Sequence, residues 1–244
     1  MRLSVFLIAL FLASPIFAET TIPAEYQISS LTTIEVSSDE FNKFENIDYG
    51  MTSGMVLDSI PPRTLDDRLN TGGKIIQTAK DMVALGEAIY DLVKKGKPTN
   101  VTEYAPISVV PRDPMTKEYV DPFELEGFSM PVEKNFITSI KNGFGQEVVK
   151  FSYKVLYSYG GSYNGKGRYL ANVIIVPGSI RTSFGWDFTA TMKLSGIMNH
   201  GTKENPVAGI MVTVKYQMNS WITAFERNDT IHINGNGYLK NHNK

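Results

Sequence analysis

The sequence predicts a mainly β protein: an antiparallel β-sandwich of about 6–8 strands, preceded by one long amphipathic α-helix. Three observations support this fold class. Apolar and polar residues alternate along several segments of the C-terminal two-thirds of the chain. Glycine- and asparagine-rich turn signals separate these segments. One earlier segment, residues 74–96, has apolar residues at helical spacing.

The first eighteen residues differ from the rest of the chain. Arg2 precedes an uncharged apolar run from Leu3 to Ala13, and Ser14 and Pro15 interrupt it before Ala18. Because a membrane-spanning helix needs about 20 apolar residues, this run suits a secretory signal peptide better than a span. Residues 1–18 are therefore predicted to be a signal peptide, with an uncleaved N-terminal anchor as the alternative.

Composition narrows the compartment and the partners. The chain has 24 Lys and Arg against 25 Asp and Glu, so its formal net charge of −1 does not indicate binding to nucleic acid. It has no cysteine, which excludes disulfides, thiolate metal sites and cysteine nucleophiles. An exported protein without disulfides is typical of bacteria. We therefore expect a periplasmic or secreted bacterial protein.

Residues 19–73 show little periodicity and are rich in Ser, Thr, Asp and Pro. They are expected to form an irregular or partly disordered leader, with a short strand around residues 32–36. Pro61 and Pro62 exclude regular structure where they occur, because neither residue can donate a backbone hydrogen bond.

Residues 74–96 are predicted to form the long amphipathic helix. Ile75, Ala79 and Met82 begin an apolar stripe that continues at steps of four and three, and Gly96 and Pro98 would end the helix. Its charged residues make it a poor membrane span. The expected role is packing against a sheet or a partner helix, and the alternative is an amphipathic helix that lies on a membrane.

Residues 101–240 are predicted to form the sandwich domain. The most distinctive stretch, residues 146–177, reads as a long hairpin with a glycine-rich loop between Gly160 and Gly167, and its second arm is apolar enough to be a central strand. Asn142-Gly143 is a strong two-residue turn signal. The remaining predicted strands lie within residues 104–110, 124–130, 135–141, 184–194, 208–218 and 230–233.

The tip of this hairpin is enriched in tyrosine and small polar residues, which supply flat apolar area with a hydrogen-bonding edge. We therefore predict a ligand-binding loop there, against the alternative that the tyrosines pack on the sheet. The candidate residues are Tyr157, Tyr159, Ser162, Tyr163, Asn164, Lys166, Arg168 and Tyr169.

We find no sequence motif that indicates a catalytic activity. Ser162 lies near Gly161 and Gly165, but the second glycine of a nucleophile elbow would have to stand at Asn164. The three histidines, His200, His232 and His242, neighbour no distinctive serine or carboxylate in sequence and are interpreted as ordinary strand, turn or tail residues. No catalytic residue, cofactor or metal site is predicted.

These observations predict an exported, non-enzymatic β-sandwich protein that binds an envelope or extracellular protein or glycan through its loops. Two alternatives remain open. One is a membrane-active, pore-forming-like protein that uses the helix at residues 74–95 on a membrane surface. The other is a small outer-membrane β-barrel. The sequence leaves the oligomeric state open.

Overall fold

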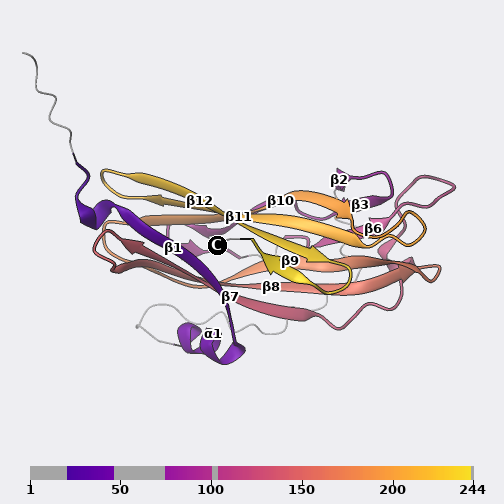
Figure 1. Cartoon of the computed structure of the whole chain (residues 1–244), viewed down its shortest axis with the longest axis horizontal. Helices are drawn as coiled ribbons and strands as arrows, with labels where there is room; N and C mark the ends of the chain where they lie inside the picture. The colour runs from indigo at the N-terminus through magenta and orange to yellow at the C-terminus, as the bar shows by residue number, and fades with distance from the viewer. Residues whose placement is uncertain (1–20, 47–74, 101–103, 243–244) are drawn as a thin grey trace, which may run out of the picture.

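The computed structural model describes residues 21–46, 75–100 and 104–242, and shows two antiparallel sheets packed face to face (Figure 1). The predicted β-sandwich is confirmed. The predicted signal peptide and residues 47–73 of the predicted leader lie outside the described residues. No helix among the described residues is long and apolar enough to cross a membrane.

The described strands number seven in one sheet and six in the other, more than the 6–8 expected. Sheet A has the order β1 (Ile28–Val36), β7 (Val132–Asn142), β8 (Glu147–Tyr163), β9 (Lys166–Thr182), β6 (Ile107–Pro111), β3 (Met82–Leu85) and β2 (Ile75–Thr78). Sheet B has the order β13 (Leu239–Asn241), β12 (Ala224–Asn234), β11 (Ala208–Asn219), β10 (Asp187–Asn199), β4 (Ile89–Lys94) and β5 (Lys97–Pro98).

The core lies between the two sheets and follows from the alternation of residues along each strand. On β8, Phe151 and Tyr153 are fully buried, and on β10 Phe188 faces them from the other sheet. The ring centroids of Phe151 and Phe188 are 5.7 Å apart. The predicted inward residues of β10 and β11 are buried as expected, but Phe184, which precedes β10, is 94% exposed.

The long hairpin of residues 146–177 is confirmed as β8 and β9, and β9 is central because it pairs with both β8 and β6. The loop between them is shorter than predicted, because both strands continue through the glycines. The turn is formed by Asn164 and Gly165, both with positive φ (51° and 70°), as a tight two-residue hairpin turn requires. At Asn142-Gly143, by contrast, the β7–β8 loop is wider than two residues, since Asn142 N–H donates to the carbonyl of Gln146.

The helix predicted for residues 74–96 is wrong. The described part of this segment, residues 75–96, forms β2, β3 and β4, so the proposed membrane-surface helix at residues 74–95 does not exist. Strand β3 is buried at every position, so its apolar residues face neighbours on both sides. Gly86 then turns the chain with φ +135°, a value that no helix contains, and its backbone lies against the carbonyl of Pro106. The wide apolar stripe was therefore the signature of short buried strands, which periodicity alone cannot distinguish from a helix.

The described part of the leader is not irregular. Strand β1 pairs with β7 along its length, which confirms the short strand predicted at residues 32–36 and extends it. Helix α1 (Ser38–Glu45) then packs on the outer face of sheet A, where Phe41 and Phe44 are buried with Ile137. The two sheets thus also include strands from residues 28–36 and 75–98, which precede the predicted sandwich domain of residues 101–240.

Candidate functional site

Three turns at one end of the sandwich carry large exposed apolar side chains. They are the β7–β8 turn (residues 143–146), the β9–β10 turn (residues 183–186) and the β11–β12 turn (residues 220–223). We call the four side chains that project from them the aromatic end. They are Phe144 (66% exposed), Phe184 (94%), Trp221 (74%) and Ile222 (53%).

Two of these turns and the N-terminal segment lie in contact with one another. Phe184 and Trp221 meet edge to face, with ring centroids 6.2 Å apart. Gly185 has φ +84°, a conformation that glycine adopts without a steric penalty. A side-chain carbon at Gly185 would lie 3.5 Å from Nε1 of Trp221 and 3.8 Å from the ring of Tyr26. The β9–β10 turn is thus placed beside both the β11–β12 turn and the N-terminal segment.

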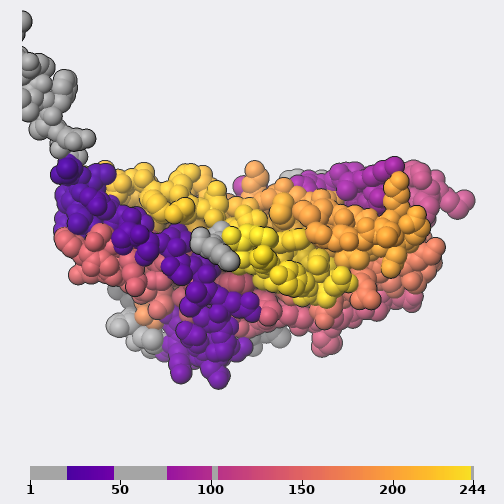
Figure 2. Space-filling model, in the orientation of Figure 1, coloured from indigo at the N-terminus to yellow at the C-terminus, as the bar shows by residue number. Residues whose placement is uncertain are grey.

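The described N-terminus reaches the domain at this same end. The N–H of Gly143 donates to the carbonyl of Ala24 over 2.8 Å, and a side-chain carbon at Gly143 would lie only 2.6 Å from that oxygen. The rings of Tyr26 and Trp186 have centroids 6.1 Å apart. Figure 2 shows the indigo N-terminal residues at the same end of the molecule as the yellow residues around the β11–β12 turn.

The aromatic end is uncharged. The three turns read GFGQ, SFGW and SWIT, without a single Lys, Arg, Asp or Glu. Phenylalanine and isoleucine side chains have no polar atom, and tryptophan has one N–H donor. Large apolar side chains that share one exposed surface mark contacts with a protein or a membrane. The four side chains of the aromatic end are therefore suited to contact with an apolar surface of a partner.

The predicted ligand-binding residues of the hairpin do not form one surface. Tyr157 and Tyr169 are buried, and burial raises the pKa of each phenol to about 12. The hydroxyl of Tyr157 donates to the carbonyl of Gly237 over 2.9 Å. Tyr159 packs against the same glycine, since a side-chain carbon there would lie 2.6 Å from its ring. These three tyrosines therefore serve the packing of β8 and β9.

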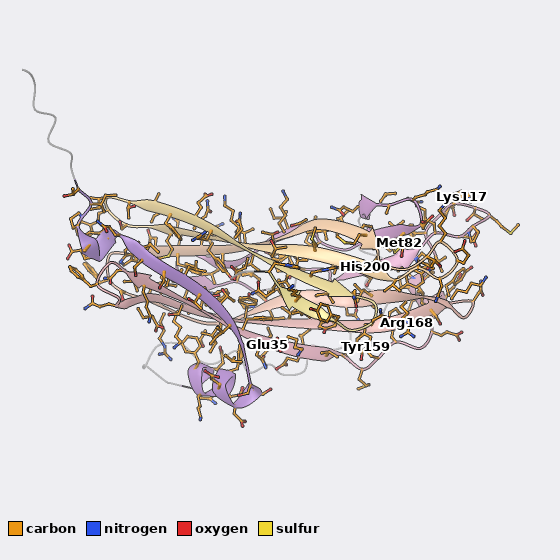
Figure 3. All side chains as sticks on the ribbon, viewed as in Figure 1. Glu35, Met82, Lys117, Tyr159, Arg168 and His200 are labelled. Atoms are coloured by element: carbon orange, nitrogen blue, oxygen red, sulfur yellow. The ribbon has the colours of Figure 1, made fainter. Side chains whose placement is uncertain are left out.

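The other candidates surround the hairpin turn at the opposite end from the aromatic end. Ser162 pairs with Glu126 in an isolated antiparallel bridge, and the hydroxyl of Tyr163 donates to Oδ2 of Asp113 over 3.4 Å. The exposed members are Asn164, Lys166 and Arg168. Figure 3 shows Arg168 in the half of the molecule that also holds Tyr159 and Lys117. A binding role for this group stays a prediction.

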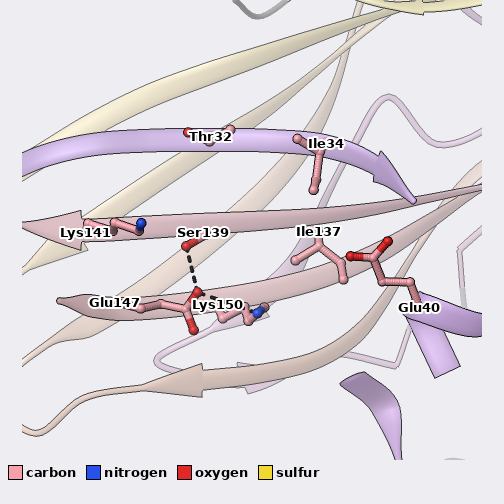
Figure 4. Close-up of a pocket in the computed structure, with 8 residues that line it drawn as sticks. All are labelled: Thr32, Ile34, Glu40, Ile137, Ser139, Lys141, Glu147 and Lys150. Carbon is pink, nitrogen blue, oxygen red and sulfur yellow. Dashed lines mark hydrogen bonds and ion pairs between the residues drawn. The ribbon is translucent and has the colours of Figure 1, made fainter. Parts of the chain in front are cut away.

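A shallow hollow lies on the outer face of sheet A beside α1 (Figure 4). Ser139 donates to Oε2 of Glu147 over 2.7 Å, and Lys150 pairs with the same carboxylate at 3.6 Å. Its volume of ≈ 250 Å³ is below the usual range for ligand pockets. The hollow is lined by residues of both charge signs that project from strands, so we interpret it as an ordinary solvated face of sheet A.

One carboxyl is buried between the sheets. Asp229 on β12 is fully buried, and its Oδ2 accepts a hydrogen bond of 2.9 Å from Tyr216. Thr138 lies 3.2 Å from the Tyr216 hydroxyl and 2.9 Å from the Thr33 hydroxyl, so the polar chain reaches β1. Burial raises the pKa of Asp229. Because Asp229 is fully buried and its hydrogen-bond chain runs through β11 and β7 to β1, we interpret it as part of the packing between the two sheets.

The described residues contain no group of three or more His, Asp or Glu side chains arranged to hold a metal ion. The chain matches no protein-family model, no curated protein and no solved structure.

Sequence reasoning missed the aromatic end because its members are far apart along the chain. The available signal was the presence of one or two large apolar residues in each of three turns whose other residues are small or polar.

Proposed function

We propose that this is an exported protein that docks on a lipid membrane surface through its aromatic end. The observation that carries the proposal is the gathering of Phe144, Phe184, Trp221 and Ile222 on three uncharged turns at one end of a rigid double sheet. Because the side chain of Phe184 is 94% exposed, it buries little apolar surface within the fold. Removal from water by an apolar partner gives it a stabilising contact.

The composition of the aromatic end favours lipid over a glycan. A glycan presents hydroxyl groups, which Phe and Ile side chains cannot hydrogen-bond. Tryptophan is the residue that prefers the boundary between headgroups and acyl chains, because its ring is apolar and its N–H can remain hydrated. Trp221 combines this chemistry with 74% exposure beside Phe184.

The position of the N-terminal segment supports the same orientation. Ala24 and Tyr26 pack against the turns of the aromatic end, so the predicted signal peptide, residues 1–18, precedes a segment fixed there. If residues 1–18 were retained as an N-terminal anchor, they would hold this end at the membrane and act together with the aromatic side chains. If they are removed, as a signal peptide is, the four side chains carry the contact alone.

The expected strength is that of a reversible, peripheral contact. Full burial of a large apolar side chain contributes roughly 1.5–3 kcal/mol, so the exposed fractions of the four side chains give roughly 4–8 kcal/mol in total. A single myristoyl chain, with an association constant of about 10⁴ M⁻¹, falls in the same range. Because the turns are uncharged, anionic lipid and low salt are not expected to strengthen the contact.

Vesicle flotation tests the proposal. Residues 19–244 are mixed with neutral phosphatidylcholine vesicles at about 0.1 M and about 1 M salt, since screening would weaken a contact based on charge. We expect the protein to float with the vesicles equally at both salt concentrations. Protein that stays at the bottom of the gradient at millimolar lipid would refute the proposal, even if an envelope protein captured it instead.

A further inference from the structure

All three histidines of the chain gather on the outer face of sheet B, although they are far apart in sequence. His200 follows β10, His232 lies within β12 and His242 follows β13. The Nε2 atoms of His200 and His232 are 2.8 Å apart, and their ring centroids are 4.7 Å apart. The ring of His242 stacks beside that of His232 at 6.1 Å.

The strands bring the first two imidazoles together for simple reasons. His232 stands between the buried residues Ile231 and Ile233, so the alternation of β12 turns it outward. On the neighbouring strand β11, Gly209 leaves the space that the ring of His200 fills. A side-chain carbon at Gly209 would lie 2.4 Å from Nε2 of His200.

Two methionines share this face. Met211 is directly opposite His232 in the register of β11 and β12, so both side chains project from the same side of the sheet. Met198 is opposite Gly209 in the register of β10 and β11, and its Cγ would lie 3.0 Å from a side-chain carbon there. Both methionines are partly exposed. The face therefore carries two imidazoles and two methionine side chains at neighbouring positions of adjacent strands.

We propose that this face binds a copper(I) ion, with Nε2 of His200 and Nε2 of His232 as ligands and a thioether of the adjoining methionines as the third. We call it the His–Met site. Thioethers select copper(I), and imidazole is a common copper ligand. The donors are all uncharged, and Lys240, opposite His232 in the register, projects from the same face. A monovalent ion suits such a surface better than a divalent one.

In the structure, the two nitrogens share a hydrogen bond, which the ion would replace. A neutral imidazole carries a lone pair on its unprotonated nitrogen, and that nitrogen is the atom that binds a metal. The hydrogen between the rings moves to an Nδ1 atom when the ion binds, so no net proton is released. Metal–nitrogen bonds of about 2.0–2.1 Å at the roughly 120° angles of a three-coordinate centre place two ligand nitrogens roughly 3.5 Å apart. The required displacement from 2.8 Å is small.

The test is a competition for copper(I) between the purified protein and a chromophoric chelator, with ascorbate present and oxygen excluded. We expect one equivalent of copper(I) to move to the wild-type protein at pH 7. His200→Ala and His232→Ala should each lower the affinity at least about tenfold. Gly209→Ala should also lower it, because it displaces His200 without removing a ligand. Circular dichroism checks that each variant is folded.

Matched variants separate this site from non-specific binding. Met211→Leu combined with Met198→Leu should lower the affinity for copper(I) and leave zinc binding unchanged, whereas Met130→Leu, which alters an 85% exposed methionine elsewhere, should change nothing. Glu204→Gln in the β10–β11 loop should also have no effect. Failure to withdraw copper(I) from the chelator, equal uptake by the His200→Ala/His232→Ala double variant, or tighter binding of zinc than of copper(I) would each overturn the proposal.

Discussion

Replacing Phe184 with serine is predicted to weaken membrane binding without weakening the fold. The side chain is 94% exposed, so nearly all of the roughly 1.5–3 kcal/mol available from burying a phenylalanine is still to be gained on contact with the proposed lipid surface. A loss of that size lowers the partition coefficient roughly 10- to 100-fold. Phe144→Ser should cost less, in proportion to its exposed fraction of 66%.

The assay is flotation at increasing lipid concentration, with urea unfolding of each variant in parallel. Phe123→Ser is the matched control, because this phenylalanine is also exposed (56%) but lies near the hairpin turn at the other end of the sandwich. All three variants should unfold within about 0.5 kcal/mol of the wild type. Unchanged flotation of Phe184→Ser, or an equal loss in Phe123→Ser, would refute the reasoning.

Three further predictions concern the fold. Because burial raises the pKa of Asp229, the folded state holds that proton more tightly, and this group's contribution to stability falls as pH rises from about 4 through the folded-state pKa. In urea unfolding, the stability of Asp229→Asn relative to the wild type should therefore increase from pH 4 to pH 8. A difference in unfolding free energy that stays constant over this range would contradict the prediction. Glu45, at the end of α1, accepts hydrogen bonds from the N–H and hydroxyl of Ser179 on β9, so Glu45→Ala should lower the free energy of unfolding by roughly 1–3 kcal/mol. The control Glu40→Ala alters an exposed residue of the same helix and should cost almost nothing. Equal losses in the two variants would show that Glu45 does not hold α1 against sheet A. Gly86→Ala places a carbon 2.5 Å from a backbone carbonyl at φ +135° and should cost more than about 2 kcal/mol, whereas Gly196→Ala meets one atom at 4.0 Å and should cost less than half as much in thermal unfolding.

The sequence predicted the sandwich because alternation is a local signal that burial enforces. On β10 and β11, each predicted inward residue from Phe188 to Leu194 and from Ala208 to Met218 faces the core. The hairpin of β8 and β9 was recognisable for the same reason. The predicted loop contained the turn but was too long, because several nearby glycines satisfied the same criterion, whereas the tight reversal needs positive φ only at Asn164 and Gly165.

The predictions that failed depended on long-range contacts. The stripe in residues 75–94 is apolar because β3 lies between two other strands of sheet A and β4 pairs with β10, and neither neighbour is visible in a local window. Strand β1 is ordered by pairing with β7, about a hundred residues away. The aromatic end and the His–Met site have the same origin, since each is assembled from separate turns or strands that only the fold brings together.

The fluorescence of Trp221 reports whether the aromatic end enters a lipid surface. The chain has two tryptophans, and Trp186→Phe removes the buried one (7% exposed), so that the 74% exposed Trp221 reports alone from the aromatic end. When neutral vesicles are added to residues 19–244 of this variant, we predict a blue shift of the emission and quenching by brominated acyl chains. Emission that stays at the position of a water-exposed tryptophan, with no quenching at saturating lipid, would contradict the account.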